Sequence, residues 1–169
     1  AIQTLNQLCT HTADGKRVYP YINIYDAPRM AWRGFMIDSG RQYQSVATIK
    51  KYIDMAAMLK MNVLHWHLTE GLGWRFASHK YPRLATIGAN VGDGPEQHGC
   101  YTKSDIEEIV RYASQHAVTV VPEIDMPGHA EAALNAYPGL CCTGEAPEIP
   151  ETGFTSHIFC AGKDSTLQF

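Results

Sequence analysis

The sequence lacks several features that would assign it to a common functional class. It has no apolar run approaching the roughly 18 residues of a membrane-spanning helix. It also has no basic block, because 14 Lys and Arg residues are spread among 17 Asp and Glu residues, for a net charge of −3. We therefore expect neither a membrane span nor a nucleic-acid partner.

The cysteines form no Cys-x-x-Cys pair, which argues against a zinc ribbon or a thioredoxin-type redox centre. The five residues are Cys9, Cys100, Cys141, Cys142 and Cys160. The last four lie in loop-like sequence, where an oxidising compartment can pair some of them, whereas a reducing compartment leaves ordinary thiols. Because the count is odd, at least one cysteine stays unpaired or bonds to another chain.

The amino terminus and the length set two further limits. Residues 1–8 lack the basic start and the long apolar core of a secretory signal peptide. The 169 residues, 45% hydrophobic and 18% charged, suit one packed globular domain. They are too few for a complete (β/α)8 barrel, which needs about 200 residues or more.

Three short apolar runs predict β-strands. They lie at residues 34–37, 62–68 and 118–121, and we expect Pro122 to stop the last one. Two stretches of helical periodicity separate the runs. The order strand, helix, strand, helix, strand predicts an α/β fold with a parallel sheet.

Apolar residues that recur at three- and four-residue steps predict the two helices. The first extends over about residues 45–60, with Ser45 as its N-cap. The second covers 106–117 and starts with a capping box of Ser104 and Glu107. Each helix leads into the next strand within a residue or two, whereas long loops follow the strands. In α/β folds, loops at the carboxyl ends of the strands build the binding site.

Two histidines and an arginine are candidates for function on the first two strands. Arg33, if it points inward, can bind vicinal hydroxyls or a carboxylate; otherwise it forms an ion pair at a strand end. His65 and His67 share one strand face, because side chains alternate with period two. They can bind a metal ion, line a polar cleft, or lie satisfied in the core.

A third cluster follows the last strand. Glu123 and Asp125 share a face, and the Pro127-Gly128 turn can bring His129 back toward Asp125. An Asp beside a His fixes the tautomer of the ring and favours its charged form. The alternative is a turn capped by Asp125 ahead of a short helix over 130–136.

Aromatic residues in the same loops have two interpretations. The rings of Trp66, Trp74 and Tyr101 can stack on the C–H face of a sugar, or they can pack in the core.

Together these segments resemble the catalytic barrel of family 20 glycoside hydrolases, the β-N-acetylhexosaminidases. The resemblance covers nearly the whole chain, in order and in spacing. Its pieces are Trp32-Arg33-Gly34-Phe35-Met36-Ile37-Asp38 with Arg41, His65-Trp66-His67-Leu68-Thr69, Gly73-Trp74-Arg75, Lys80-Tyr81-Pro82, Tyr101-Thr102, and Val121-Pro122-Glu123-Ile124-Asp125-Met126-Pro127-Gly128-His129.

The resemblance implies a fold and an activity. Residues 31–169 would form about the first three βα units of a partial TIM-type (β/α)8 barrel, and residues 1–30 a lead-in from a preceding domain. The parent enzyme would release terminal N-acetylglucosamine or N-acetylgalactosamine with retention, by substrate-assisted catalysis on a carbohydrate partner. It would need no cofactor and no metal ion. We expect the parent protein to be secreted, periplasmic or lysosomal.

The resemblance also implies roles for single residues. Asp125 and His129 would support the proton chemistry of the general acid. Arg33 would bind sugar hydroxyls and His67 would line the pocket wall. Glu70 would keep the first of two acidic residues that many members carry there, while Gly71 replaces the second. Trp74 would bind substrate.

One departure bears on activity. The family carries its catalytic Asp-Glu pair in a His-x-Gly-Gly-Asp-Glu motif after the fourth strand, and no such motif occurs here. We therefore expect the pair to lie beyond Phe169 and the isolated chain to be inactive.

Two other hypotheses remain open. The chain can be a metal-dependent barrel hydrolase that uses His65 and His67 with Glu123 or Asp125. It can also be a non-catalytic sugar-binding or interaction module. In either case a three-stranded sheet leaves two unpaired edges, which favours self-association or pairing with the rest of a barrel.

Overall fold

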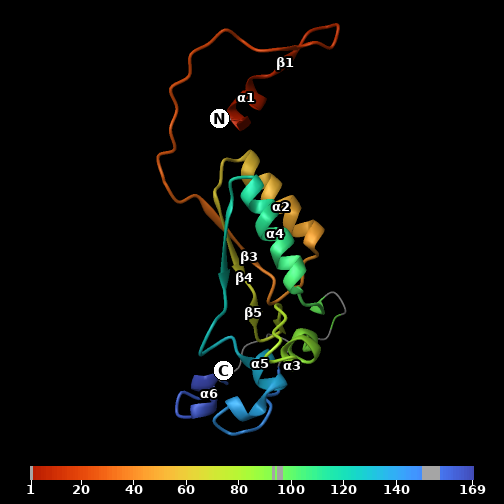
Figure 1. Cartoon of the computed structure of the whole chain (residues 1–169), viewed down its shortest axis with the longest axis vertical. Coiled ribbons are helices and arrows are strands. Elements are labelled where there is room, and N and C mark those ends of the chain that lie inside the picture. The colour runs from red at the N-terminus through yellow and green to blue at the C-terminus, as the bar shows by residue number, and fades with distance from the viewer. Residues whose placement is uncertain (1, 93, 95–96, 150–156) are drawn as a thin grey trace.

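The computed structural model describes residues 2–92, 94, 97–149 and 157–169, and its architecture is α/β (Figure 1). The strands are β1 Thr10–His11, β2 Arg17–Val18, β3 Gly34–Asp38, β4 Val63–His67, β5 Thr69–Glu70, β6 Gly73–Trp74 and β7 Thr119–Glu123. The helices are α1 Ile2–Leu8, α2 Val46–Met58, α3 Arg83–Thr86, α4 Lys103–Gln115, α5 Glu131–Ala136 and α6 Asp164–Gln168, with 3₁₀ turns η1 Gly88–Asn90 and η3 Pro138–Leu140. In the described part of the chain, no helix has the length and apolar character needed to cross a bilayer.

The three longest strands form one parallel sheet in the order β3-β4-β7. Helix α2 connects β3 to β4 and helix α4 leads into β7, so the predicted alternation is confirmed. Asp38, His67 and Glu123 are register partners at the last position of their strands. The carboxyl end of the sheet therefore presents a row of three ionisable side chains.

The end of the third strand differs from the prediction. Pro122 was expected to stop it, but β7 continues through Glu123. The Glu123 carbonyl accepts a hydrogen bond of 3.1 Å from the Leu68 N–H, on the side of β4. The backbone groups of Pro122 face the other side, where no described strand pairs with β7. Because no ladder bond is lost there, the strand tolerates a proline.

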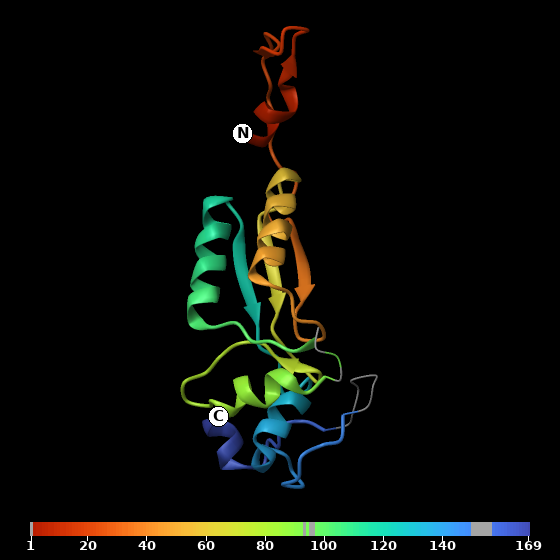
Figure 2. The same cartoon turned by 90° about the vertical axis from the view of Figure 1, so that its right-hand side faces the viewer.

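Helices α2 and α4 lie side by side and cover one face of the sheet (Figure 2). Ile49 and Ile53 of α2 and Ile109 of α4 are completely buried in one apolar cluster with Leu64 and Trp66 of β4. These are the residues that the three- and four-residue spacing selects. The predicted core faces of both helices are thus confirmed.

The amino end of α2 forms as predicted. Ser45 has an extended backbone, and its hydroxyl accepts a hydrogen bond of 3.2 Å from the Thr48 N–H. The helix ends at Met58, two residues before the predicted end, because Lys60 adopts a left-handed backbone conformation (φ 60°) that turns the chain toward β4.

The amino end of α4 lies two residues from its predicted place. The capping box is formed by Thr102 and Asp105, whereas Ser104 lies inside the helix. The Asp105 carboxylate accepts a hydrogen bond of 2.8 Å from the Thr102 N–H. Tyr101 keeps the preceding chain extended, since its N–H donates to the Arg75 carbonyl over 2.8 Å. The helix therefore starts directly after this anchored residue.

A second apolar cluster lies beyond the carboxyl ends of the strands, where α3, α5 and α6 gather (Figures 1 and 2). At its centre are Trp74, Leu84, Leu134 and Phe159, each nearly or completely buried. The long loops after β4 and β7 thus have a core of their own, which fixes their position below the sheet.

One disulfide lies within the last of these loops. Cys142 and Cys160 are bonded, whereas the thiols of Cys9, Cys100 and Cys141 are free. The prediction that an oxidising environment pairs some of the last four cysteines agrees with this bond.

The amino-terminal segment lies outside the sheet. Helix α1 has no buried residue, and both strands of the β1-β2 hairpin are exposed. Figure 1 shows the segment projecting beyond the amino ends of the strands. That residues 1–30 come from a preceding domain stays a prediction.

The packing of α2 on the sheet can be tested with Ile53→Ala. This substitution removes a completely buried side chain, so we expect the free energy of unfolding to fall by about 2–5 kcal/mol. Urea denaturation followed by circular dichroism measures the change. Met58→Ala, at an exposed position of the same helix, should change it by less than about 1 kcal/mol. Equal losses in the two variants would contradict this packing.

Candidate active site

Charged side chains converge at the carboxyl end of the sheet. Asp38 and His67 end β3 and β4, and Glu70 lies in the β5-β6 hairpin that follows β4 directly. Asp125 and His129 follow β7. Parallel strands place these segments at one edge, where α/β proteins bind their ligands.

Glu70 is the centre of the cluster. Its side chain is 2% exposed, and its Oε1 lies 2.8 Å from Nη2 of Arg41. Arg41 also forms an ion pair with Asp38, whose Oδ1 accepts a hydrogen bond of 3.0 Å from the Arg41 N–H. These carboxylates outweigh the cost of partial burial and raise the pKa of Arg41. Since 40% of the Arg41 side chain is exposed, its guanidinium can still reach a ligand.

His67 lies between two carboxylates. Its Nδ1 is 3.0 Å from Oε1 of Glu123, and its Nε2 is 3.8 Å from Oε2 of Glu70. Glu70 is the largest cause that raises the pKa of His67 to about 9; burial opposes this effect, and Glu123 adds to it. In turn, His67 and His65 lower the pKa of Glu123 despite its partial burial. His67 therefore carries a positive charge at neutral pH.

His129 meets the cluster from the loop after β7. Its Nδ1 lies 3.0 Å from Oδ2 of Asp125 and 3.0 Å from Oε2 of Glu70. The left-handed backbone of His129 (φ 50°), uncommon for a non-glycine residue, turns the chain back toward the sheet. The predicted approach of His129 to Asp125 is confirmed. Asp125 is held by a hydrogen bond of 2.8 Å from its N–H to Oγ1 of Thr69.

His65 does not share a metal-ligand set with His67. Its Nε2 pairs with Oε2 of Glu123, while His67 uses the other oxygen of the same carboxylate. Among the described residues, the group whose ligand atoms converge is His67, Asp125 and His129. The hypothesis of a His65–His67 metal pair is therefore wrong, because Glu123 separates the two rings.

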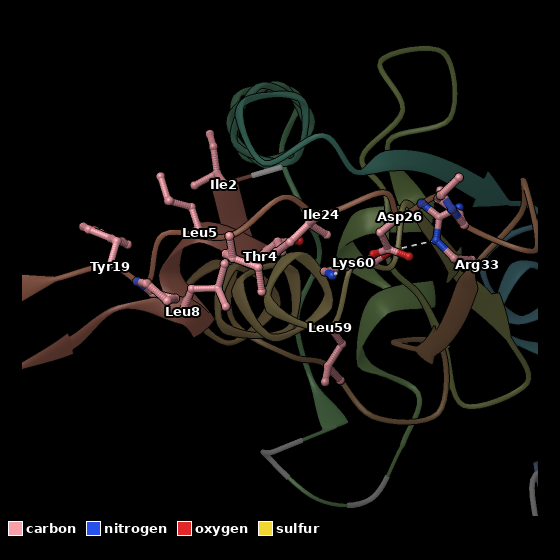
Figure 3. A pocket seen from close by; sticks show the side chains of 14 residues that line it. Ile2, Thr4, Leu5, Leu8, Tyr19, Ile24, Asp26, Arg33, Leu59 and Lys60 are labelled. Carbon is pink, nitrogen blue, oxygen red and sulfur yellow. Dashed lines mark hydrogen bonds and ion pairs between the residues drawn. The ribbon is translucent and has the colours of Figure 1, made fainter.

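Arg33 lies at the other end of the sheet. It precedes β3, and its guanidinium donates hydrogen bonds to the carbonyls of Lys60, Met30 and Ala31 over 2.7, 2.6 and 3.2 Å. Figure 3 shows it beside Asp26 in a groove that α1 and the lead-in segment line. The structure thus does not bring Arg33, a predicted substrate-binding residue, into the charged cluster, since side chains before a strand lie at the opposite end from those after it. Arg41 instead lies within the turn after β3, at the carboxyl end of the sheet.

Trp74 packs in the second apolar cluster instead of lining a pocket. It is 3% exposed, and its Nε1 donates a hydrogen bond of 2.8 Å to the Phe76 carbonyl. Its ring lies 6.1 Å from the ring of Phe169. Trp66 and Tyr101 are likewise buried. Trp74, a predicted substrate-binding residue, is thus packed in the core, as are the other two rings.

Arg75 is a structural residue that the sequence did not reveal. Its guanidinium is completely buried and donates to the carbonyls of Ser39, Gly40, Ala89 and Gly99 over 2.7, 2.8, 2.8 and 3.1 Å. Burial lowers its pKa to about 10, so it stays charged at neutral pH. Through Ser39 and Gly40, Arg75 fixes the turn that carries Arg41.

The same turn is packed tightly against Glu70. A Cβ atom at Gly40 would come within 2.6 Å of Cβ of Glu70, so only glycine fits. The Ser39 hydroxyl accepts a hydrogen bond of 2.8 Å from Nε1 of Trp66 and lies 3.1 Å from the Tyr101 hydroxyl. Buried polar contacts thus set the distance between Arg41 and Glu70.

Comparison with known proteins identifies the family. The sequence profile of the catalytic domain of glycosyl hydrolase family 20 matches residues 30–169. The chain belongs to glycosyl hydrolase family 20. A β-hexosaminidase of Porphyromonas gingivalis is 48% identical over 154 residues, which cover 89% of this chain and 20% of that protein. For a β-hexosaminidase of Akkermansia muciniphila the identity is 41% over 174 residues, covering 99% of this chain and 35% of that protein.

Solved structures of this family have the same fold. The β-N-acetylhexosaminidase of Bacteroides fragilis superposes with a TM-score of 0.91 at 60% identity, over 99% of this chain and 33% of that one. A mutant Streptomyces plicatus β-hexosaminidase in complex with its product GlcNAc gives a TM-score of 0.88 at 43% identity, over 99% and 35%. The chain thus spans between 20% and 35% of the length of these relatives.

The role of Arg75 can be tested with Arg75→Leu. This change leaves several buried carbonyls without a donor, so the free energy of unfolding should fall by at least about 3 kcal/mol. Arg111→Leu, at an exposed position of α4, is the matched control and should change it by less than about 1 kcal/mol. Urea denaturation measures both. A loss in Arg75→Leu no larger than in the control would show that the buried contacts contribute nothing.

The charge of His67 predicts a pH dependence of stability. Because folding raises its pKa from 6.5 to about 9, its contribution is fully present below pH 6.5 and is lost as the pH rises through 9. The loss amounts to at most about 3 kcal/mol in the free energy of unfolding. Urea denaturation between pH 6 and about 10 measures it. His67→Gln should lack this decline; the same decline in that variant would contradict the assignment.

Proposed function

We propose that this chain forms the first three βα units of the (β/α)8 barrel of a β-N-acetylhexosaminidase. The observation that carries the proposal is the cluster around Glu70 at the carboxyl end of the sheet, where barrel enzymes place their active sites. Family membership and the printed names of the relatives support it. The substrate would be a glycan that ends in N-acetylglucosamine or N-acetylgalactosamine.

In this proposal the reaction is substrate-assisted hydrolysis with retention. The acetamido oxygen of the substrate attacks the anomeric carbon while a Glu protonates the leaving oxygen, and an adjacent Asp orients the acetamide. The family motif that carries this pair, His-x-Gly-Gly-Asp-Glu, does not occur in residues 1–169. The chain would therefore supply the substrate-binding and supporting half of the site, and later units of the barrel the acid.

Each site residue of this chain would have a role that follows from its position. Arg41, partly exposed and paired with Asp38 and Glu70, would donate hydrogen bonds to sugar hydroxyls. Asp125 and His129, 3.0 Å apart and partly exposed, would hold and move a proton next to the acid. His67 would form the wall behind them, next to Glu70.

The disulfide bears on the cellular compartment of the parent protein. A disulfide between Cys142 and Cys160 favours an oxidising environment, so the parent protein would be secreted, periplasmic or lysosomal.

Among the described strands, β3 and β7 are the edges of the sheet. The remaining strands of the barrel would pair with them, which makes the rest of the barrel the structural partner of this chain.

Hydrolysis of a chromogenic N-acetyl-β-glucosaminide tests the proposal. The isolated chain should give no turnover above buffer, because it lacks the general acid, whereas the full-length protein that contains it should hydrolyse the substrate. In that protein, Arg41→Ala should lower kcat/KM by about 100-fold, since it removes a charged hydrogen-bond donor.

The matched control is Arg33→Ala, which removes the same kind of side chain at the opposite end of the sheet. It should leave kcat/KM within about threefold of the unmodified protein. Turnover by the isolated chain at the rate of the full-length protein would contradict the proposal that the general acid comes from later units of the barrel. Sugar binding by a full-length protein that hydrolyses nothing would instead support a non-catalytic module.

A further inference from the structure

We propose that Glu123 is a positioning residue of this site, which holds the ring of His67 in the orientation that supports Glu70 and His129. The two oxygens of its carboxylate are divided between two rings. Oε1 lies 3.0 Å from Nδ1 of His67, and Oε2 pairs with Nε2 of His65. Glu123 ends β7 and both histidines belong to β4, so the contact joins neighbouring strands. The inference rests on the proposed function wherever hydrolysis is measured.

The three side chains lie on the face of the sheet opposite to α2 and α4. Leu64 and Trp66 of β4 are buried in the cluster beneath the helices, so His65 and His67, which alternate with them, point to the other face. In the proposed barrel this face would be the interior, where bulky apolar side chains usually pack. Polar groups in such a place need polar partners. Glu123 provides one to each histidine.

The contact with Glu123 determines how the ring of His67 is turned. An imidazole ring can rotate about its bond to Cβ with a broad, roughly two-fold preference, so its place on a strand does not fix the ring. A half-turn would put carbon atoms where the two nitrogens lie. With Nδ1 held by Glu123, Nε2 instead lies 3.8 Å from Oε2 of Glu70. The side chain of His67 is 5% exposed, so little water competes for either nitrogen.

His67 in turn bears on the group that holds His129. Oε2 of Glu70, which faces His67, lies 3.0 Å from Nδ1 of His129. The rings of His67 and His129 stand perpendicular, with their centres 5.5 Å apart. The same Nδ1 of His129 lies 3.0 Å from Oδ2 of Asp125. Through His67 and Glu70, Glu123 thus acts on the pair to which the proposed function assigns proton transfer.

The ionisable groups around His67 come from the neighbouring segments. They are Asp38 of β3 with its partner Arg41, Glu70 of β5, Glu123 of β7 with its partner His65, and Asp125 and His129 of the loop after β7. Glu70 and Glu123 raise the pKa of His67 to about 9 against the effect of burial, and Asp38 adds to the rise. Loss of the Glu123 charge would leave Glu70 as the main opposing charge, so the pKa should fall in part.

Nuclear magnetic resonance titration of His67 in Glu123→Gln tests the contact. This variant of the 169-residue chain keeps the shape of the side chain and removes its charge. The pKa of His67 should fall from about 9 to about 8 or below, because a nearby opposite charge changes a pKa by about 1–3. Glu107→Gln, 62% exposed on α4, is the matched control and should leave this pKa unchanged. No hydrolysis is measured, so the result does not depend on the proposed function.

The pH profile of the full-length protein tests the effect on the site. If charged His67 supports the site, kcat/KM falls as the pH rises through the pKa of His67. In Glu123→Gln this fall should begin at lower pH. The ratio of kcat/KM at about pH 8.5 to that at about pH 6 should be about threefold lower than in the unmodified protein. A side chain that only stabilises the fold would lower the free energy of unfolding without moving this profile.

A measurement on the unmodified chain carries the test if circular dichroism shows that Glu123→Gln is misfolded. At about pH 7.5, nitrogen-15 resonances should show His67 protonated at both ring nitrogens, with the Nδ1 proton protected from exchange by its bond to Glu123.

Three outcomes would overturn the proposal. They are a neutral His67 ring in the unmodified chain at about pH 7.5, an unchanged His67 pKa in folded Glu123→Gln, and a pH profile of kcat/KM that this variant leaves in place. A lowered His67 pKa beside a full-length protein that hydrolyses nothing would support the contact with Glu123 and contradict the proposed function alone.

Discussion

The arrangement of this site depends on one buried carboxylate. Glu70 is 2% exposed, and a charge in that position is tolerated only if partners surround it. Arg41 approaches one oxygen, and His67 and His129 approach the other. Arg41 and His129 come from the loops after β3 and β7, and His67 ends β4, so one carboxylate holds two loops against the end of the central strand.

Buried contacts with the backbone position these charged groups. The guanidinium of Arg75 binds backbone carbonyls of the turn after β3, and Gly40 of that turn packs directly on Glu70. The hairpin that carries Glu70 also carries Arg75, since β5 and β6 pair across it. The position of Arg41 is thus determined by a buried network before any substrate is present, as a binding site requires.

The sequence predicts local periodicity well and side-chain direction poorly. The core face of α2, its cap at Ser45 and the approach of His129 to Asp125 follow from spacing and turn chemistry alone. One motif contains both Arg33 and Arg41, and only the position of β3 shows that the two arginines lie at opposite ends of the sheet. The role of Arg75 depends on carbonyls distant in sequence, which no pattern records.

The resemblance of the motifs to family 20 was confirmed because it rested on an ordered set of short segments, not on any one of them. Single residues were a weaker guide. An aromatic such as Trp74 suits a sugar site and a core equally well, and its burial alone decides between them. Function is therefore best argued from the charges that the fold brings together.

The most direct test of this account is the pKa of His67 in Glu70→Gln, measured by nuclear magnetic resonance of the imidazole. If Glu70 organises the cluster, the pKa of His67 should fall from about 9 toward its ordinary value of 6.5. A His67 pKa that remains near 9 in the folded variant would contradict the central role of Glu70.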